Sequence, residues 1–515
     1  MCLSQKGPAI NSTPVKYVMQ GGLVNINIPV LIVAPFTHSH HVIKQYSGPF
    51  EFLKGSNTEQ RPQPSLRTNQ KQNPQIPQKG PTPISPNKLS LFLHGYPKFE
   101  LDYLVNGFKH GFKIGFQRQN FCDMFCNNLK SARQNPSIVT SKIRKEIDME
   151  RVMAPFSLKP FPIKHCSSLG LVEKKEPGEY RLIHHLSFPE GLSINDAIPE
   201  EELFVQYSSV NDAIDLIKKC GRGAFCAKTD IKSAFRLINL SQSEFKYLGF
   251  VWQNQFYFDC CLPFGLSSSC KIFERFSTAL QWCAQTKLEI HNMTHVLDDF
   301  IIVESSQKTC NHNLALFLEM CKSLGVPIAD EKTVEACQVI TFLGIELDTI
   351  NMEARLPDEK VQKCKIKISE FLTKSKVTLR ELQSLIGLLN FACNVVIPGR
   401  PFLRRLINLT IGVSKPFYKV RLTKSAKLDL SVWLNFLKEF NGKCLFLPDE
   451  FVSSSTLKLY TDASGTNGYA AVFGNQWFCG QWDVNWANKN IAVLELYPIV
   501  IAVEIWSQLK KISSI

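Results

Sequence analysis

Two adjacent aspartates in the segment HVLDDFIIVES, residues 295–305, constrain the fold of this chain more than any other feature. The apolar and β-branched residues around them predict a buried strand. Burial of unpaired carboxylates is costly, so Asp298 and Asp299 need a strong local partner or a bend toward solvent. Because successive side chains of a strand point to opposite faces, both can face one metal ion only at a hairpin turn. The segment therefore predicts a β-hairpin with a metal ion at its turn.

A third aspartate has a similar setting earlier in the chain. The segment GAFCAKTDIKSAFRLINL, residues 223–240, predicts a strand that ends at Asp230 and a turn or short helix after it. If this strand neighbours the one near Asp298, the carboxylates converge. Converging carboxylates, completed by phosphate oxygens and water, are what two Mg²⁺ ions need for phosphoryl transfer. We expect Asp298 to be a direct ligand and Asp299 an accessory.

Composition and charge narrow the class of protein. The chain has 515 residues, 44% hydrophobic and 20% charged, a balance typical of about two to four globular domains. Its 59 Lys and Arg against 45 Asp and Glu give a net charge of +14, which favours a polyanionic partner. The 17 cysteines are scattered and no secretory signal opens the chain, so we expect a cytoplasmic or nuclear protein that is not secreted. Its apolar stretches are too short or too polar to span a membrane.

A low-complexity segment and a hairpin pattern organise the first half of the chain. Residues 55–88 are rich in proline, glutamine and asparagine and predict a disordered linker. The segment LGLVEKKEPGEYRLIHHLS, residues 169–187, predicts a β-hairpin. Lys174 and Arg181 lie near its tip.

The chain beyond residue 355 has a helical pattern. Its apolar residues recur at helical spacing, with Lys360, Lys363 and Lys367 outside the apolar face. Thr378 and Glu381 have the spacing of a helix capping box. These features predict a helical region with basic flanks.

Together and in this order, the segments resemble the motifs of reverse transcriptases. KTDIKSAF resembles the first palm motif, which implies that Asp230 binds metal and that Phe235 lies under the incoming sugar and excludes a 2′-hydroxyl. LPFGLSSSCKIFERF resembles the nucleotide-positioning motif, with Phe264 and Gly265 at the nucleotide. VLDDF resembles the double-aspartate hairpin, and TFLGIELD the primer grip. GVPIADEKT supplies Lys332, which this resemblance places near the leaving pyrophosphate.

The hairpin near residue 174 extends the resemblance to triphosphate binding. Lys174 and Arg181 match the positions that clamp the triphosphate in this family. Two positions depart from the pattern: Val296 replaces a common aromatic residue, and Phe264 stands where some members have glutamine. These departures bear on fidelity and nucleotide choice more than on catalysis.

The resemblance implies an α+β right-hand polymerase of fingers, palm and thumb with a helical connection. Its implied catalytic residues are Asp230, Asp298, Asp299 and Lys332, with Mg²⁺, or alternatively Mn²⁺, held by the three aspartates. The implied partners are an RNA template, a DNA primer and deoxynucleoside triphosphates. The expected domains are a leader (1–54), the linker (55–88), a helical N-terminal extension (89–150), fingers and palm (151–348), a helical thumb and connection (349–455) and a partial ribonuclease H-like domain (456–515).

The amino-acid sequences of several segments resemble one group of reverse transcriptases more closely. YRLIHHLSFPEG, GVPIADEKT, LQSLIGLLNFAC and NIAVLELYPIVIAV are similar to the polymerases of DIRS-type retrotransposons, from about residue 91 onward. LYTDASG and LELYPIV resemble the first strand and first helix of the ribonuclease H domain of such elements, with Asp462 and Glu495 as two of its four metal-binding acids. The other two would follow residue 515, so we expect a C-terminally truncated α/β domain that does not cleave RNA–DNA hybrids. A recombinase would be encoded separately.

Two functional classes remain open at this point. One is an RNA-directed DNA polymerase of a mobile element, and the other is a catalytically inactive, nucleic-acid-binding remnant of one. The three intact aspartates favour the polymerase. Phe235 has a simpler alternative as a core aromatic residue, and Lys174 and Arg181 as solvated residues of a hairpin tip.

Overall fold

The computed structural model divides the chain into two compact units, residues 1–72 and 73–515. In the first unit, β1 (Pro14–Met19) and β2 (Gly22–Asn27) form an antiparallel ladder. The rest of the predicted leader and residues 55–75 of the predicted linker lie outside the described residues. The described residues are 14–19, 22–27, 76–118, 123–153, 155–173, 178–439, 443–446, 454–486 and 489–507.

The prediction of a disordered linker is wrong for residues 76–88. Lys79 pairs with Ser241 in an isolated β-bridge, and the side chain of Ile84 is buried. The hydroxyl of Ser85 accepts a hydrogen bond from the Lys88 amide and caps the next helix. Composition misled here because a segment with few apolar residues can still be ordered by backbone hydrogen bonds to a folded neighbour.

Residues 89–150, for which the sequence predicts a helical extension, are mainly helical where the structure describes them, with one two-residue strand. Leu89, Leu104 and Phe108 are buried in one large apolar cluster, and the Phe108 ring meets the Phe276 ring edge to face at 4.9 Å. The elements are α1 (Pro86–Phe92), α2 (Lys98–His110), β3 (Met124–Phe125), α3 (Lys130–Gln134) and α4 (Pro136–Asp148).

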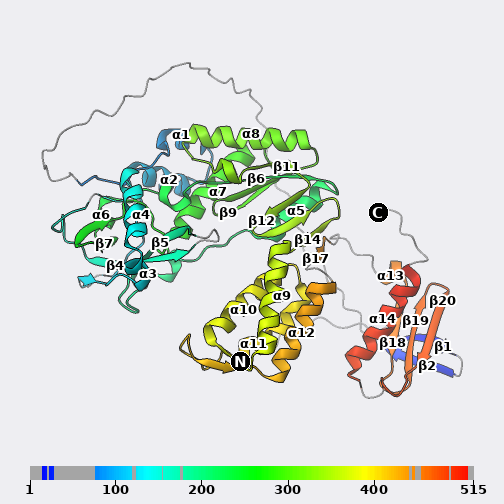
Figure 1. Cartoon of the computed structure of the whole chain (residues 1–515). Helices are drawn as coiled ribbons and strands as arrows, with labels where there is room; N and C mark the ends of the chain where they lie inside the picture. Colours follow the sequence, from blue (N-terminus) through cyan, green and yellow to red (C-terminus); the bar gives the residue numbers. More distant parts are fainter. Residues whose placement is uncertain are drawn as a thin grey trace, which may run out of the picture. The chain divides into compact units, whose positions relative to one another are not determined.

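A five-stranded sheet, here called the hairpin sheet, contains the predicted β-hairpin (Figure 1). Its order is β3-β4-β7-β8, with β5 also paired to β4. Glu173 lies opposite Tyr180 at the end of the β4–β5 ladder, which confirms the predicted hairpin. Val139 and Ile143 of α4 pack on this sheet. The strands are β4 (His165–Glu173), β5 (Tyr180–His185), β7 (Gly249–Trp252) and β8 (Gln255–Phe258), and α6 (Gln242–Phe245) precedes β7.

A four-stranded antiparallel sheet, the central sheet, has the order β11-β6-β10-β9. In β10, Phe300 and Ile302 face one apolar cluster with α7 and α8, whereas Ile301 and Val303 face another with α5. Burial on both faces explains the continuous apolar run in the sequence. The elements are α5 (Val210–Cys220), β6 (Phe225–Asp230), α7 (Ser269–Lys287), β9 (Met293–Val296), β10 (Asp299–Glu304), α8 (Gln307–Leu324) and β11 (Val334–Cys337).

A buried ionic network joins the two sheets. Arg236, in the 3₁₀ turn η3 (Ala234–Leu237), lies 2.8 Å from Asp259 and 2.9 Å from Glu146 of α4. His184 of β5 approaches the other oxygen of Asp259 at 2.9 Å. Burial works to lower the pKa of Arg236, but Asp259 and Glu146 outweigh it and raise that pKa. The network therefore keeps a charged arginine inside the protein.

The region beyond residue 348 is helical, as predicted, but it also contains strands that the sequence pattern missed. In this region β14 and β17 complete the sheet β12-β13-β14-β17, whose first two strands end by residue 348, and β15 pairs with β16. Trp433 of α12 is fully buried among these helices, and the predicted Thr378–Glu381 capping box is confirmed. The elements are β12 (Val339–Phe342), β13 (Ile345–Asp348), β14 (Glu353–Arg355), α9 (Asp358–Thr373), β15 (Lys376–Thr378), α10 (Leu379–Ala392), η5 (Ile397–Leu403), α11 (Arg404–Asn408), β16 (Lys419–Arg421), α12 (Lys424–Glu439) and β17 (Lys443–Leu445).

The last described part is a three-stranded antiparallel sheet with one helix on it. Helix α14 packs on β18 and β19, with Ala502 and Trp506 buried and Leu496, Val500 and Val503 exposed. None of the helices within the described ranges is long and apolar enough to cross a lipid bilayer. The elements are α13 (Ser454–Leu457), β18 (Leu459–Ala463), β19 (Gly468–Phe473), β20 (Gln476–Gln481) and α14 (Ile491–Ser507).

Candidate active site

Neighbouring strands of the central sheet bring three aspartates together. Asp299, the first residue of β10, lies opposite Asp230, the last residue of β6. Asp298 lies in the tight turn between β9 and β10, and its carbonyl accepts a hydrogen bond from the Ile231 amide at 3.0 Å. The predicted convergence at paired strand ends is therefore confirmed.

The electrostatics of this cluster favour a cation. Burial raises the pKa of Asp298, and the nearby Asp230 raises it further. Burial, together with Asp298 and Asp230, raises the pKa of Asp299 to about 6. The cluster thus holds more negative charge than its surroundings neutralise, which is typical of functional sites.

Lys332 supplies the nearest positive charge. Its Nζ lies 2.8 Å from Asp230 Oδ2, while its side chain remains 58% exposed. Burial works to lower the pKa of Lys332, but its hydrogen bond to Asp230 and the three carboxylates raise it. The 3₁₀ turn η4 (Asp330–Lys332) positions it, because the Ala329 amide before the turn donates to the Asp230 carbonyl at 2.9 Å.

The donor set fits a hard cation such as Mg²⁺. All three side chains offer carboxylate oxygens, which Mg²⁺ prefers, and their mutual repulsion would be relieved by a positive ion. Among the described residues, no three His, Cys, Asp or Glu side chains are arranged to hold a metal ion by themselves. An ion held by Asp230 and Asp298 would therefore take further oxygens from water or substrate phosphates.

Glu274 of α7 supports the turn that carries Asp298, and the sequence motifs did not single it out. Leu297 has a φ of +54°, a left-handed conformation that is unfavourable for a branched side chain. Its amide donates to Glu274 Oε2 at 3.0 Å. His295 Nε2 lies 3.3 Å from the other oxygen of this buried carboxylate. In the sequence, the only hint of this role is that Glu274 is the single acid in KIFERF, alongside three apolar residues.

Two aromatic rings and an arginine form one wall beside the aspartates. The centroids of the Phe235 and Phe264 rings are 5.5 Å apart, and the Arg181 guanidinium lies 5.3 Å from the Phe264 ring. Phe235 also meets Phe273 of the core at 5.7 Å, so it is half-buried with one side against the protein. The structure thus groups three predicted nucleotide-site residues. Lys174, which was also predicted there, lies outside the described residues.

Gly265 lies where the chain comes very close to β5. It has a φ of +110°, and a Cβ placed on it would overlap the His184 carbonyl oxygen. Asn195 holds the same loop, because its Nδ2 donates to the Gly265 carbonyl at 2.8 Å and its Oδ1 accepts from the Ser267 amide at 2.9 Å. No sequence pattern singled out Asn195.

A cavity of about 360 Å³ opens between the hairpin sheet and η3. Arg181 and Phe264 line it, and so does the buried pair Arg236 and Asp259. Six Lys or Arg side chains and two acids face this space, which suits an anionic ligand such as a triphosphate.

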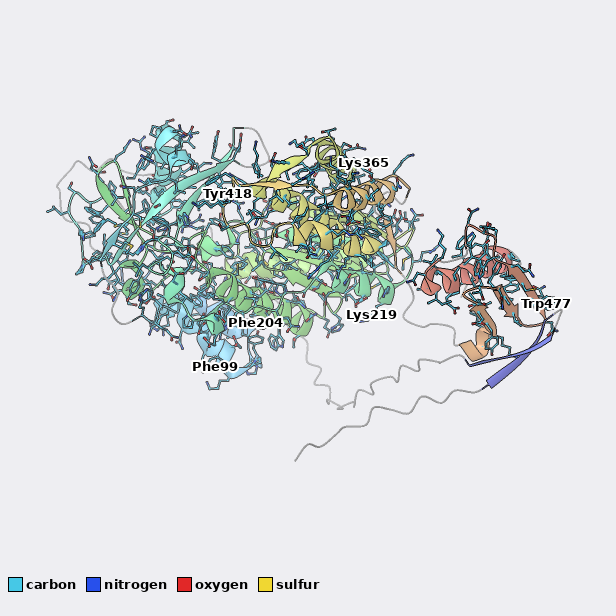
Figure 2. All side chains as sticks on the ribbon, turned by 90° about the horizontal axis from the view of Figure 1, so that it is seen from below. Phe99, Phe204, Lys219, Lys365, Tyr418 and Trp477 are labelled. Carbon is cyan, nitrogen blue, oxygen red and sulfur yellow. The ribbon has the colours of Figure 1, made fainter. Side chains whose placement is uncertain are left out.

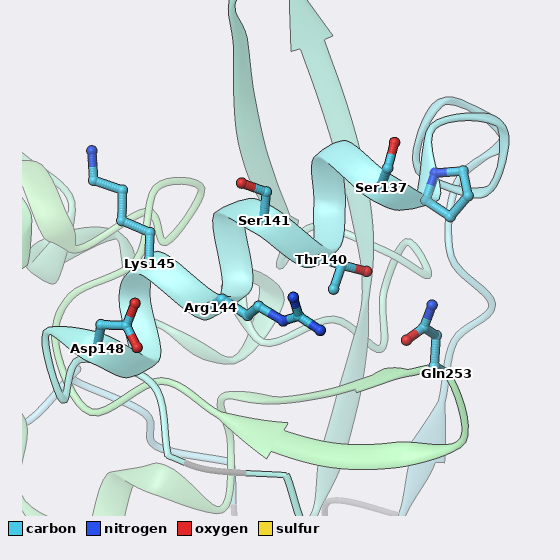
Figure 3. Close-up of a pocket in the computed structure, with 8 residues that line it drawn as sticks. Ser137, Thr140, Ser141, Arg144, Lys145, Asp148 and Gln253 are labelled. Carbon is cyan, nitrogen blue, oxygen red and sulfur yellow. The ribbon is translucent and has the colours of Figure 1, made fainter.

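A second, open cavity of about 590 Å³ lies along α4 (Figure 3). Its lining is polar, and Arg144 extends from the helix toward Gln253 at the β7–β8 turn. None of the predicted site residues lines it. Its chemistry therefore adds nothing to the carboxylate site.

The C-terminal sheet brings together the two acids predicted there. Burial raises the pKa of Glu495, and Asp462 raises it further, whereas a backbone hydrogen bond from Ala463 lowers it. The two carboxylates of β18 and α14 are thus electrostatic neighbours.

The fold resembles that of a solved viral polymerase. The chain superposes on the foamy viral protease-reverse transcriptase dRH, determined in complex with double-stranded DNA, with a TM-score of 0.51. The match has 15% sequence identity and covers 82% of this chain and 72% of the viral one. It supports a mixed α+β polymerase fold.

Residues 172–347 match the family model described as "Reverse transcriptase (RNA-dependent DNA polymerase)". This range contains the three aspartates, Lys332 and the aromatic wall, so the chain carries a reverse transcriptase domain.

The chain also resembles curated polyproteins of retroelements and viruses. Polyprotein P3 of Commelina yellow mottle virus is 24% identical over 181 residues, which make up 35% of this chain and 9% of the polyprotein. The retrovirus-related Pol polyprotein from transposon opus of Drosophila melanogaster is 22% identical over 343 residues, 65% of this chain and 32% of the polyprotein. The chain thus spans 32% or less of the length of these two relatives.

Proposed function

We propose that this chain is the RNA-directed DNA polymerase of a DIRS-like retrotransposon and that it works by two-metal nucleotidyl transfer. One observation carries the proposal: Asp230 and Asp299 pair across β6 and β10, with Asp298 in the adjoining turn, inside a reverse transcriptase domain. The relatives in retroelements support the mobile-element origin. The DIRS-like subtype rests on the sequence resemblance.

In the proposed reaction, the primer 3′-oxygen attacks the α-phosphorus of the nucleotide, and the bond to pyrophosphate breaks. Asp230 and Asp298 would hold the metal ions, with Asp299 as an accessory. Mg²⁺, or Mn²⁺ in its place, would supply activation of the 3′-hydroxyl and neutralisation of the phosphate charge. The ammonium of Lys332 donates to the leaving pyrophosphate, because it is exposed and held beside Asp230.

The aromatic wall and the basic cavity would bind the nucleotide. Arg181 and Lys174 clamp the triphosphate as charge-assisted donors. Phe235 lies under the sugar and leaves no space for a 2′-hydroxyl, while Phe264 and Gly265 shape the same pocket.

The proposed partners are an RNA template, a DNA primer and deoxynucleoside triphosphates. The net charge of +14 supports a polyanionic partner.

We also propose that residues 456–515 belong to a ribonuclease H-like domain. The proximity of Asp462 and Glu495 supports a shared metal-binding role. Two carboxylates alone leave two ions short of oxygens, so further oxygen ligands would be needed for cleavage of RNA–DNA hybrids.

Primer extension on an RNA template tests the polymerase proposal. We expect extension in Mg²⁺, its loss on addition of EDTA, and a loss of several orders of magnitude in Asp230→Asn and Asp298→Asn, with template binding retained. Asp215→Asn is the matched control, because this exposed acid of α5 pairs only with Lys218 among the described salt bridges. Full extension by Asp298→Asn would overturn the proposal.

A further inference from the structure

The two-stranded ribbon of β15 and β16, with the loop before β16, concentrates unneutralised positive charge. Lys376 lies directly opposite Arg421 in the antiparallel register, and Lys419 lies opposite Thr378. The side chains of Lys376, Lys419 and Arg421 are exposed on the outward face. Val377 and Val420 are buried on the inward face. Like charges directly opposite each other destabilise a β-ribbon. An anionic ligand would remove that penalty.

The protein itself does not neutralise these cations. Within the described part of the chain, no salt bridge involves Lys376, Lys419 or Arg421. The nearby Glu381 is engaged elsewhere, because it bonds the Thr378 backbone and side chain and lies 3.2 Å from Lys374. The basic side of the ribbon therefore faces solvent.

Two exposed aromatic rings stand beside the cations. Phe417 is 69% exposed and Tyr418 is 45% exposed, and their rings meet edge to face at 5.2 Å (Tyr418 is labelled in Figure 2). Their loop is tied to the start of α10, because the Leu379 amide donates to the Tyr418 carbonyl at 2.8 Å and the Arg380 amide donates to the Pro416 carbonyl at 2.9 Å. The rings are thus held on a fixed backbone.

Two of the three lysines of α9 that the sequence singled out, Lys360 and Lys367, are less available. Lys360 donates to the Gly344 carbonyl at 2.9 Å and lies over the Phe391 ring, and Lys367 pairs with Glu370 at 3.7 Å. Lys360 and Lys367 are thus engaged with other groups, whereas no described salt bridge engages the cations of the ribbon.

We propose that this ribbon and loop, residues 376–378 and 415–421, bind single-stranded nucleic acid. Phosphates lie at Lys376, Lys419 and Arg421, and unpaired bases stack on Phe417 and Tyr418. Cations alone would suit any polyanion, but exposed rings beside them select a strand whose bases are not paired. The inference rests on the proposed function only in its choice of partner, because binding here requires no catalysis.

Fluorescence anisotropy with a short unstructured RNA tests the cationic part. The full-length double variant Lys376→Ser/Arg421→Ser should bind more weakly, and the slope of log affinity against log salt should fall by about 1.4, since each phosphate contact on a single strand contributes about 0.7. The control Lys308→Ser/Lys322→Ser removes the same charge from exposed positions on α8. An unchanged slope in the ribbon variant, or an equal fall in the control, would overturn the proposal.

Substitution of the two aromatic rings tests whether the site prefers single-stranded or double-stranded nucleic acid. Phe417→Ser/Tyr418→Ser should lower affinity for the RNA about five- to hundredfold and leave affinity for a blunt duplex of equal length unchanged. Equal losses on both ligands would overturn the single-strand assignment. Thermal melting of each variant checks folding, and Asp298→Asn measured in parallel separates the outcomes, because it should lose extension but keep this binding.

Discussion

The raised pKa of Asp299 links the active site to the stability of the protein. Its folded value of about 6 exceeds the ordinary 3.8, so between these values the folded protein binds more protons than the unfolded chain. Stability from this group is therefore greatest in acid and falls as the pH rises from about 4 to about 6. At neutral pH the charged cluster strains the metal-free fold.

We predict that Asp299→Asn stabilises the metal-free protein at pH 7.5. The gain should be on the order of 1–2 kcal/mol, because the amide removes one of three mutually repelling charges. The difference should shrink near pH 4, and also on addition of Mg²⁺, which neutralises the wild-type cluster. Thermal unfolding in EDTA across this pH range measures it. A wild-type protein as stable as the variant at pH 7.5 would show that the repulsion is absent.

A second prediction at this scale concerns the sugar. Phe235→Ala should raise incorporation of ribonucleotides relative to deoxyribonucleotides by about ten- to hundredfold, because the ring packed against Phe273 can no longer block the 2′-hydroxyl. Single-nucleotide incorporation with each substrate gives the ratio. Phe273→Leu is the control for disturbance of the core alone. An unchanged ratio would leave Phe235 as a core residue.

Residue patterns predicted the carboxylates but not their supports. Asp230, Asp298 and Asp299 stand out because charged residues are costly in buried strands, so their positions require a reason. Asn195 and Glu274 act through long-range hydrogen bonds to loops, and such contacts leave no local pattern. Their partners lie 70 and 23 residues away along the chain.

At the scale of elements, the conformation of the β9–β10 turn depends on one hydrogen bond, from the Leu297 amide to Glu274. Leu297, which precedes Asp298, has a left-handed backbone conformation. The buried carboxylate of Glu274 accepts a hydrogen bond from the Leu297 amide. Without that acceptor, the amide would be unsatisfied and the strained conformation would lose its compensation.

We therefore predict that Glu274→Ala lowers kcat about ten- to hundredfold with little change in KM, since Asp298 moves while the nucleotide pocket stays. Glu274→Gln should restore most of the rate, because its amide oxygen can still accept the Leu297 hydrogen. Steady-state primer extension measures both. A glutamine variant as slow as the alanine variant would indicate that the negative charge matters instead.

Element prediction succeeded where the pattern was long and failed where it was short. The helices of the region beyond residue 355 follow from apolar periodicity over several turns. Strands β15 and β16 have three residues each and pair across more than forty positions, from Lys376 to Arg421. Three residues are too few to show an alternating pattern, so this ribbon emerges only from the tertiary structure.

For the whole molecule, the excess of basic residues sets the salt response. We predict that affinity for an RNA template annealed to a DNA primer falls linearly on a log–log plot with salt, by about 0.9 per phosphate neutralised if the duplex behaves like B-form DNA. Filter binding over a range of potassium chloride concentrations measures the slope. A flat response would mean that the +14 charge does not contact the backbone.

The order of strand-rich and helical segments was predictable because each pattern keeps its place along the chain, but the start of the described segment 76–118 was not. The low-complexity composition continues up to residue 88, yet within the described residues 76–88 the backbone of Lys79 pairs with Ser241, just before α6. Composition indicates whether a segment can form a hydrophobic core of its own. It does not indicate whether the segment can pack against the core of a neighbouring region.

The ionic network around Arg236 has a mechanical consequence. It joins Glu146 of α4 and His184 of β5 through Arg236 of η3 and Asp259, and separating such buried charges is costly in free energy. A movement of the β4–β5 hairpin that leaves this network intact would therefore pivot beyond His184. The lever arm from that pivot to Arg181 is three residues of strand, roughly 10 Å. Because this segment is so short, the displacement of Arg181 relative to His184 is small and the segment bends little.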